Sequence, residues 1–280
     1  MKQAESMRSL ADYPNLAQRA ATGFAGAALI IFGIVFSEWS YFAVFLLICF
    51  FSLREFYQLA GLDGMEPQKF IGILAGITVF SLSFLIEKHL LSYRYYFFIF
   101  PLLSITYLIK LYKTEKKPFT NIAFTFLGVF YVAVPFALLN HAVYESGEYN
   151  YEILLGLLLI LWASDTGAYF AGIRFGKHKL FERISPKKSW EGFWGGALLA
   201  LIITYIVSLY FTSLSVGSWL VMGVLIIVGG TFGDLVESLL KRSMEIKDSG
   251  TSLPGHGGFL DRFDGLLISA PFIVAYLEIF

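Results

Sequence analysis

Long apolar stretches dominate this chain and limit what it can fold into. The hydrocarbon core of a bilayer is about 30 Å thick, so a helix needs roughly 20 apolar residues to cross it. Nine stretches approach that length: 20–36, 39–53, 70–86, 95–112, 119–139, 152–172, 193–211, 218–237 and 265–280. Hydrophobic residues make up 57% of the 280 residues and charged residues only 15%, which excludes an ordinary soluble domain. The sequence therefore predicts an all-α, polytopic integral membrane protein.

The lysines and arginines indicate how these helices are oriented. Cytoplasmic loops of membrane proteins carry an excess of basic residues. If the N-terminus is cytoplasmic and all nine stretches cross the membrane, 19 of the 21 basic residues fall in cytoplasmic segments, and only Lys88 and Arg94 fall outside. An even number of spans would destroy this segregation. We therefore expect about nine transmembrane helices, with the N-terminus cytoplasmic and the C-terminus outside.

The chain is predicted to form a single membrane domain over residues 1–280, because it contains no internal repeat and no low-complexity linker. Residues 1–150 consist of apolar spans joined by ordinary loops, and we expect them to serve as a scaffold and in dimerisation. Residues 151–280 concentrate charged, glycine and hydroxyl-bearing residues, so we expect the chemistry there. The formal net charge is zero, which gives no overall basic character for nucleic-acid binding.

Acidic residues within or at the ends of predicted spans are the first candidates for function, because ionisable groups at membrane depth are expensive. Asp165 and Asp234 lie within two predicted spans, Glu237 ends the second of these, and Asp264 directly precedes a third. These acids lie toward the predicted cytoplasmic side, and Asp261 lies one helical turn before Asp264. Carboxylate oxygens suit Mg²⁺, which uses one or two carboxylates and leaves other positions for substrate phosphates. The sequence therefore predicts a magnesium site near the cytoplasmic surface.

Polar groups around these acids are suited to binding phosphate. Two lysines and a serine precede the seventh predicted helix, whose N-terminus favours anions. A serine and a lysine share a helix face with Asp234, and a glycine-rich loop exposes backbone N–H groups as anion-binding nests do. These candidates are Lys187, Lys188, Ser189, Ser238, Lys241 and the loop 252–258. Together they indicate a polyphosphate substrate.

Four sequence blocks in the second half carry a resemblance to a known family. The blocks are 164–170 (SDTGAYF), 185–192 (SPKKSWEG), 233–242 (GDLVESLLKR) and 247–264 (KDSGTSLPGHGGFLDRFD). They resemble the signature of the phosphatidate cytidylyltransferases, also called CDP-diacylglycerol synthases. The motifs cover about the last 120 residues, and no charged motif position departs from the family pattern.

The resemblance implies that CTP condenses with phosphatidic acid to give CDP-diacylglycerol and pyrophosphate with Mg²⁺ as cofactor, and it suggests a K⁺ ion beside the Mg²⁺. It also implies a homodimer among membrane lipids, in a bacterial inner (plasma) membrane, with the active site facing the cytoplasm. The family's metal-site acids correspond to Asp234, Asp261 and Asp264. The residues predicted to act in catalysis are Asp234, Asp261, Lys241 and Asp165. The residues predicted to bind substrate are Lys187, Lys188, Ser189, Ser238, Arg242, Lys247, Asp248, His256, Gly257, Gly258 and Arg262.

Several of these residues also have simple structural explanations. Asp165 could pair with a lysine of a neighbouring helix, and Asp264 could cap the ninth helix. The basic residues could be ordinary cytoplasmic flanking charges. His256 has little to do as a base, because the phosphate of the lipid is already an anionic nucleophile. Glycines 192, 195 and 196 are spaced as a helix-packing seam is.

Two other functions fit parts of the sequence. An enzyme that acts on another lipid-linked phosphate, such as a polyprenol phosphate, would use similar polar groups. An ion-coupled transporter also has acids within the membrane and glycine-broken helices. The absence of an inverted repeat, and the clustering of the acids on one side instead of at the midplane, argue against the transporter.

Overall fold

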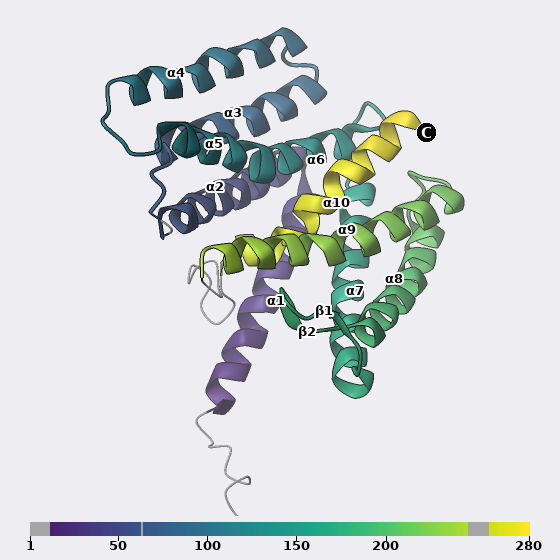
Figure 1. The fold of residues 1–280 in the computed structure, drawn as a ribbon. Coiled ribbons are helices and arrows are strands. Elements are labelled where there is room, and N and C mark those ends of the chain that lie inside the picture. Colours follow the sequence, from purple (N-terminus) through teal and green to yellow (C-terminus); the bar gives the residue numbers. More distant parts are fainter. Residues whose placement is uncertain (1–11, 63, 246–257) are drawn as a thin grey trace, which may run out of the picture.

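The computed structural model describes residues 12–62, 64–245 and 258–280, and most of them are helical. The α-helices are α1 (Asp12–Phe36), α2 (Glu38–Leu62), α3 (Lys69–Glu87), α4 (Ile99–Leu111), α5 (Pro118–Gly128), α6 (Val134–Tyr144), α7 (Glu152–Phe175), α8 (Trp190–Tyr210), α9 (Val216–Ser243) and α10 (Leu260–Ile279). A 3₁₀ helix, η1 (Tyr93–Phe98), leads into α4, and a π-helical turn, η2 (Val129–Ala133), joins α5 to α6 (Figure 1).

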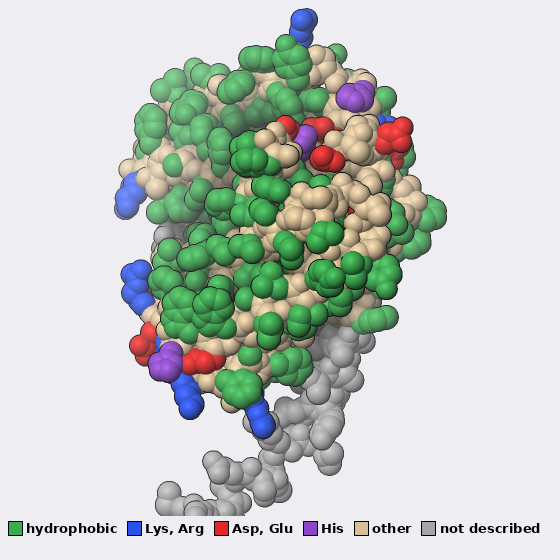
Figure 2. All heavy atoms as spheres, turned by 90° about the vertical axis from the view of Figure 1, so that its right-hand side faces the viewer, with side chains coloured by type: hydrophobic (Ala, Val, Ile, Leu, Met, Phe, Trp, Pro, Cys, Tyr) green, Lys and Arg blue, Asp and Glu red, His purple; other side chains and the backbone are tan. Residues whose placement is uncertain are grey.

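Seven helical segments of the described chain are long and apolar enough to cross a membrane. They are Glu38–Gly61, Lys69–Glu87, Tyr93–Leu111, Pro118–Tyr144, Glu152–Phe175, Trp190–Tyr210 and Val216–Ser243. Figure 2 shows the matching surface, on which apolar side chains cover a broad area and basic ones gather toward its edges. The prediction of a polytopic helical membrane protein is confirmed. The first and ninth predicted spans correspond to α1 and α10, and their crossing of the membrane stays a prediction.

The fold departs from an all-α chain at one small hairpin between α7 and α8. Strands β1 (Lys179–Phe181) and β2 (Ser185–Ser189) pair antiparallel, with Lys179 opposite Ser189 and Phe181 opposite Ser185. The two strands are short, polar and exposed over most of their length, so they lack the apolar alternation that predicts a strand. The all-α class holds for the fold as a whole, and this hairpin is an element that the sequence did not predict. The hairpin carries Lys187 and Lys188 up to the start of α8.

Glycines bring the helices of the second half very close together. A Cβ atom at Gly233 of α9 would lie 2.4 Å from the carbonyl oxygen of Asp264 in α10, and the Cα of Gly230 lies 3.3 Å from the Cβ position of Gly265. The same holds between α7 and α8, where a Cβ at Gly196 would lie 2.6 Å from the Ser164 carbonyl oxygen. Small residues at such crossings are the usual means by which membrane helices approach one another. The predicted packing role of the glycines at the start of α8 is therefore confirmed.

Candidate active site

A half-exposed ion pair joins the hairpin to α9. The Nζ of Lys188 lies 2.6 Å from Oδ2 of Asp234, and 3.4 Å from the carbonyl oxygen of Thr231. Ser238, one turn after Asp234, donates a hydrogen bond of 3.3 Å to Oδ1 of the same carboxylate. The Asp234 side chain remains 44% exposed. A ligand from outside can therefore reach this carboxylate, and that of Asp165 is exposed as well.

A second, buried assembly joins α9 to α10, and we call it the Lys241 cluster (Glu237, Lys241 and Asp261). The Nζ of Lys241 lies 2.5 Å from Oε2 of Glu237 and 2.6 Å from Oδ1 of Asp261. Only 1% of the Glu237 side chain and 11% of the Asp261 side chain are exposed. The backbone N–H of Gly258 donates a 3.1 Å hydrogen bond to Oδ2 of Asp261. One lysine therefore bridges two buried carboxylates from different helices.

Asp165 and Asp264 connect the two assemblies electrostatically. The charge of Asp264 interacts with those of Asp234, Asp165 and Lys188, and also with that of Glu237. Asp165, on α7, interacts in turn with Asp234, Lys188 and Arg262. The close approach of α9 and α10 at their glycines is what places these carboxylates in one region. The structure thus gathers acids from three helices around two lysines.

The alternative role of Asp264 as a helix cap was wrong. Helix α10 begins at Leu260, so Asp264 lies inside its second turn, where Oδ1 accepts a 2.7 Å hydrogen bond from the N–H of Gly265. The acceptor at the start of the helix is instead Glu55 of α2, whose Oε2 receives a 2.9 Å hydrogen bond from the N–H of Leu260. The sequence placed this helix start five residues too late, because the charged residues of its first turns interrupt the apolar run.

The remaining predicted substrate contacts lie in varied surroundings. Ser189 is the N-cap of α8, and its Oγ accepts a 3.1 Å hydrogen bond from the N–H of Gly192. Lys187, Arg242 and Arg262 are exposed. Lys247, Asp248, His256 and Gly257 lie outside the described residues.

The carboxylate oxygens at the site are donors that suit Mg²⁺, but they do not by themselves form a complete metal site. The described part of the chain holds no group of three or more acidic, histidine or cysteine side chains arranged to hold a metal ion. Asp234 and Asp261, two of the three predicted ligands, contact different lysines. Because Mg²⁺ takes one or two protein carboxylates and fills other positions with phosphate oxygens, the residues present fit a site that substrate completes.

Sequence reasoning missed two polar residues of this region, Glu55 and Tyr131. Glu237 was among the candidate acids but was given no role, and it is a buried partner of Lys241. Glu55 contacts a residue 205 positions away, which no local pattern can reveal. The Tyr131 hydroxyl lies in η2, where the charges of Glu237 and Asp264 act on it. In a regular α-helix Pro135 would clash with the carbonyl of Tyr131, four residues earlier, which fits the π-helical turn found there; this proline is the signal that the sequence offers for η2.

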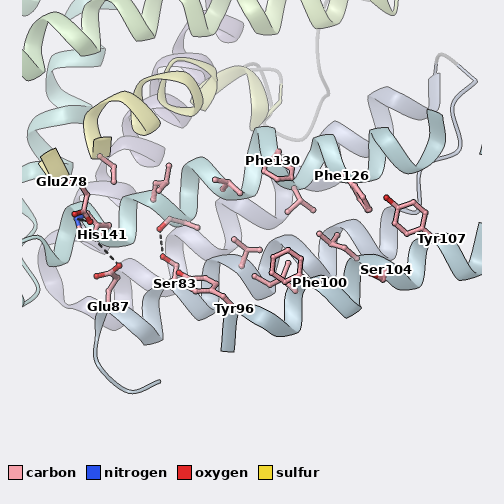
Figure 3. A pocket seen from close by; sticks show the side chains of 18 residues that line it. Ser83, Glu87, Tyr96, Phe100, Ser104, Tyr107, Phe126, Phe130, His141 and Glu278 are labelled. Carbon is pink, nitrogen blue, oxygen red and sulfur yellow. Dashed lines mark hydrogen bonds and ion pairs between the residues drawn. The ribbon is translucent and has the colours of Figure 1, made fainter. Parts of the chain in front are cut away.

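An apolar groove of about 750 Å³ lies away from these charges, between α3, α4, α5–α6 and the end of α10 (Figure 3). One end is polar, because His141 contacts Oε1 of Glu87 at 3.4 Å and Oε1 of Glu278 at 2.9 Å. The rest is mostly apolar and aromatic, as its side chains Tyr96, Phe100, Tyr107, Phe126 and Phe130 illustrate. No residue that lines the groove was predicted to belong to the site, so it is a separate feature.

Comparison with known proteins identifies the group to which the sequence is related. The model of the cytidylyltransferase family matches residues 17–280. The chain belongs to this family. A phosphatidate cytidylyltransferase of Staphylococcus aureus (strain COL) is 40% identical over 177 residues, which are 61% of this chain and 66% of the relative. One of Staphylococcus haemolyticus is 42% identical over 176 residues, 62% of this chain and 64% of the relative. The matched part thus spans slightly less than two thirds of these cytidylyltransferases, and the family resemblance seen in the motifs is confirmed.

Proposed function

We propose that this protein condenses CTP with phosphatidic acid to give CDP-diacylglycerol and pyrophosphate, for phospholipid biosynthesis. The observation that carries the proposal is the pair of lysine-bound acidic assemblies, Asp234–Lys188 and the Lys241 cluster, on the motif blocks of a cytidylyltransferase. The similarity to proteins named phosphatidate cytidylyltransferase supplies the choice of nucleotide and lipid.

The proposed reaction needs positioning and charge neutralisation more than covalent help from the protein. A phosphate oxygen of phosphatidate bonds to the α-phosphorus of CTP, and the bond from that phosphorus to the bridging oxygen of the β-phosphate breaks. Pyrophosphate leaves with the electron pair. Lys187, Lys188 and the backbone N–H groups near Gly258 would offset the charge of two anions brought together, which is the main task in such transfers.

We further propose that Asp234, Asp261 and Asp264 hold Mg²⁺ together with phosphate oxygens of CTP. The ion would neutralise charge on the transferring and leaving phosphates. The half-exposed Asp234 carboxylate and the hard oxygen donors support this assignment. Beside the Mg²⁺, a K⁺ ion is proposed from the family resemblance alone.

The membrane arrangement of the proposed enzyme follows from its charges. We propose nine spans, an inner (plasma) membrane location and an active site on the cytoplasmic side, where a lipid substrate can enter sideways. Every residue of the two lysine-bound assemblies lies in or next to segments that the basic-residue pattern assigns to the cytoplasm. A homodimer through the first 150 residues is part of the same proposal.

The test is pyrophosphate release by the purified protein in mixed micelles of detergent and phosphatidate. CTP, dCTP, ATP, GTP and UTP are compared, and polyprenol phosphate replaces phosphatidate in a parallel series. We expect release only with a cytidine nucleotide and phosphatidate, loss of release with EDTA, and recovery with Mg²⁺. Turnover with polyprenol phosphate alone, or ion flux in proteoliposomes without CTP turnover, would overturn the proposal.

A further inference from the structure

Two residues of α2 hold the start of α10. The carboxylate of Glu55 accepts the 2.9 Å hydrogen bond from the N–H of Leu260, and the ring of Phe51 stacks on that of Phe259 with centroids 5.0 Å apart and planes 15° from parallel. Phe51 and Glu55 are four residues apart and therefore share one face of α2. We call Phe51, Glu55, Phe259 and Leu260 the α10 clamp.

The clamp supplies what the start of α10 lacks. The first N–H groups of a helix have no partner within the helix. Phe259, the residue at the N-cap position, has no side-chain acceptor and makes no capping hydrogen bond. A carboxylate from elsewhere satisfies one of these donors and also interacts favourably with the helix dipole. In α10 the capping group therefore comes from a different part of the chain.

The burial of Glu55 indicates that this contact is more than incidental. Its side chain is 1% exposed, and burying a carboxylate costs free energy that a single hydrogen bond offsets only in part. Its other oxygen, Oε1, has no hydrogen-bond partner in the described chain. An apolar residue of similar volume would suit packing alone as well or better. What the carboxylate adds is a fixed position for the N–H of Leu260.

Asp261 follows Leu260 directly, and Asp264 follows one turn later. The position of the first turn of α10 thus determines where the carboxylate of Asp261 pairs with Lys241. It also determines how close the carboxylate of Asp264 lies to the charge of Asp234. We propose that Glu55 is a positioning residue, which acts through the backbone of α10 to hold Asp261 and Asp264 in place. This inference rests on the proposed function for its effect on turnover, whereas the capping contact itself does not.

Two substitutions separate reach from charge. Glu55→Gln keeps an oxygen acceptor at the same reach and removes the charge, whereas Glu55→Asp keeps the charge and withdraws the acceptor by one methylene. Ser83→Ala is the matched control, because Ser83 is buried and donates a 2.7 Å hydrogen bond from α3 to the Ala137 carbonyl of α6, outside the α10 clamp. All three variants of the full-length protein are assayed with CTP and phosphatidate, and hydrogen exchange is followed in the peptide that contains Leu260.

We expect Glu55→Asp to lower kcat by at least roughly tenfold with little change in the KM for CTP, since displaced catalytic groups lose mainly transition-state interactions. In Glu55→Asp, the amide hydrogens of the first turn of α10 should exchange faster than in the wild type. Glu55→Gln keeps the acceptor, and Ser83→Ala leaves the α10 clamp intact. Both variants should therefore stay within about threefold of wild-type turnover.

Wild-type kcat and exchange in Glu55→Asp would overturn the proposal. So would a loss in Glu55→Gln as large as that in Glu55→Asp, because an acceptor at the same reach would then fail to preserve turnover. An equal loss in Ser83→Ala would show a general packing effect. If the wild type fails to use CTP and phosphatidate, the proposed function fails, while the exchange measurement still decides whether Glu55 caps α10.

Discussion

Lys188 and Lys241 both pair with acids of the site, but their surroundings differ. Lys241 faces two buried carboxylates, whereas Asp234, the partner of Lys188, is 44% exposed. Removing one partner of a buried pair leaves an uncompensated charge and costs about 3–5 kcal/mol, whereas exposed pairs contribute about 0–1 kcal/mol. We therefore expect Lys241→Met to lower the unfolding midpoint in detergent far more than Lys188→Met. Combining Lys241→Met with Glu237→Gln should restore part of the loss, and equal effects of the two lysine variants would contradict this reasoning.

The carboxylates of Asp234 and Asp261 should both matter for turnover, and that of Asp261, a partner of the buried Lys241, should matter for folding as well. Replacing either with asparagine keeps the shape and removes the charge that the proposed Mg²⁺ site requires. Loss of such electrostatic stabilisation costs roughly a hundredfold or more in turnover. We expect that loss for Asp234→Asn and Asp261→Asn in the purified proteins with CTP and phosphatidate. Glu148→Gln, in an exposed loop before α7, is the matched control, and wild-type rates in both aspartate variants would refute the assignment.

At the scale of helices, the contact of α9 with α10 depends on the absence of a side chain at Gly233. An added Cβ would lie 2.4 Å from backbone of α10, which has no flexible end to move away. We expect Gly233→Ala to push the helices apart, and so to lower both the unfolding midpoint and turnover. Gly217→Ala, in the same helix, places its Cβ no closer than 3.7 Å to a neighbour and should be neutral or stabilising. Equal effects of the two variants would exclude a role for the close approach.

The connection between α4 and α5 contains a pH-sensitive ion pair. Lys110 donates a 2.6 Å hydrogen bond to Oε1 of Glu115, and Asn121 donates a 2.7 Å bond to Oε2. Burial alone would raise the pKa of Glu115, but these hydrogen bonds outweigh it and hold that pKa below its ordinary value of 4.5. A pKa that is lower in the folded state adds stability above the unfolded value, and this stability is lost as the pH falls through the folded value. At pH 7 the thermal midpoint of the wild type should therefore be higher than that of Glu115→Gln. The two midpoints should converge as the pH falls below 4.5.

The sequence predicted helices and acids well where the signal is local. Apolar runs gave the seven long spans, and the i, i+3 spacing singled out Asp261 and Asp264. It failed where a contact joins distant segments, as Glu55 and Leu260 do, because nothing near Glu55 distinguishes it from a charge at a span end. It also failed at the β1–β2 hairpin, whose pairing does not bury an apolar face. Hydropathy also placed the start of α10 too late, because the charged residues of its first turns interrupt the apolar run.

For the whole molecule, the direction of each helix decides whether the acids face the cytoplasm. In Figure 1 the C-terminal ends of α2, α4 and α9 lie on the left, and the basic-residue pattern assigns all three ends to the cytoplasm. The acids of α9 lie toward the same end of that helix. An odd number of spans keeps this agreement, whereas an even number would place the C-terminus on the same side as the N-terminus.

Single cysteines can test this arrangement, because the chain has one native cysteine, Cys49, and it is fully buried. Lys113→Cys and Lys187→Cys lie in exposed segments predicted to be cytoplasmic, and Glu148→Cys and Phe280→Cys in exposed positions predicted to be outside. In intact cells, a membrane-impermeant maleimide should label only the latter two, and the lysine positions should react only after permeabilisation. If Phe280→Cys reacted only after permeabilisation, as the lysine variants should, the number of spans would be even. Labelling of Lys187→Cys in intact cells would turn the proposed active site away from the cytoplasmic CTP on which the proposed reaction depends.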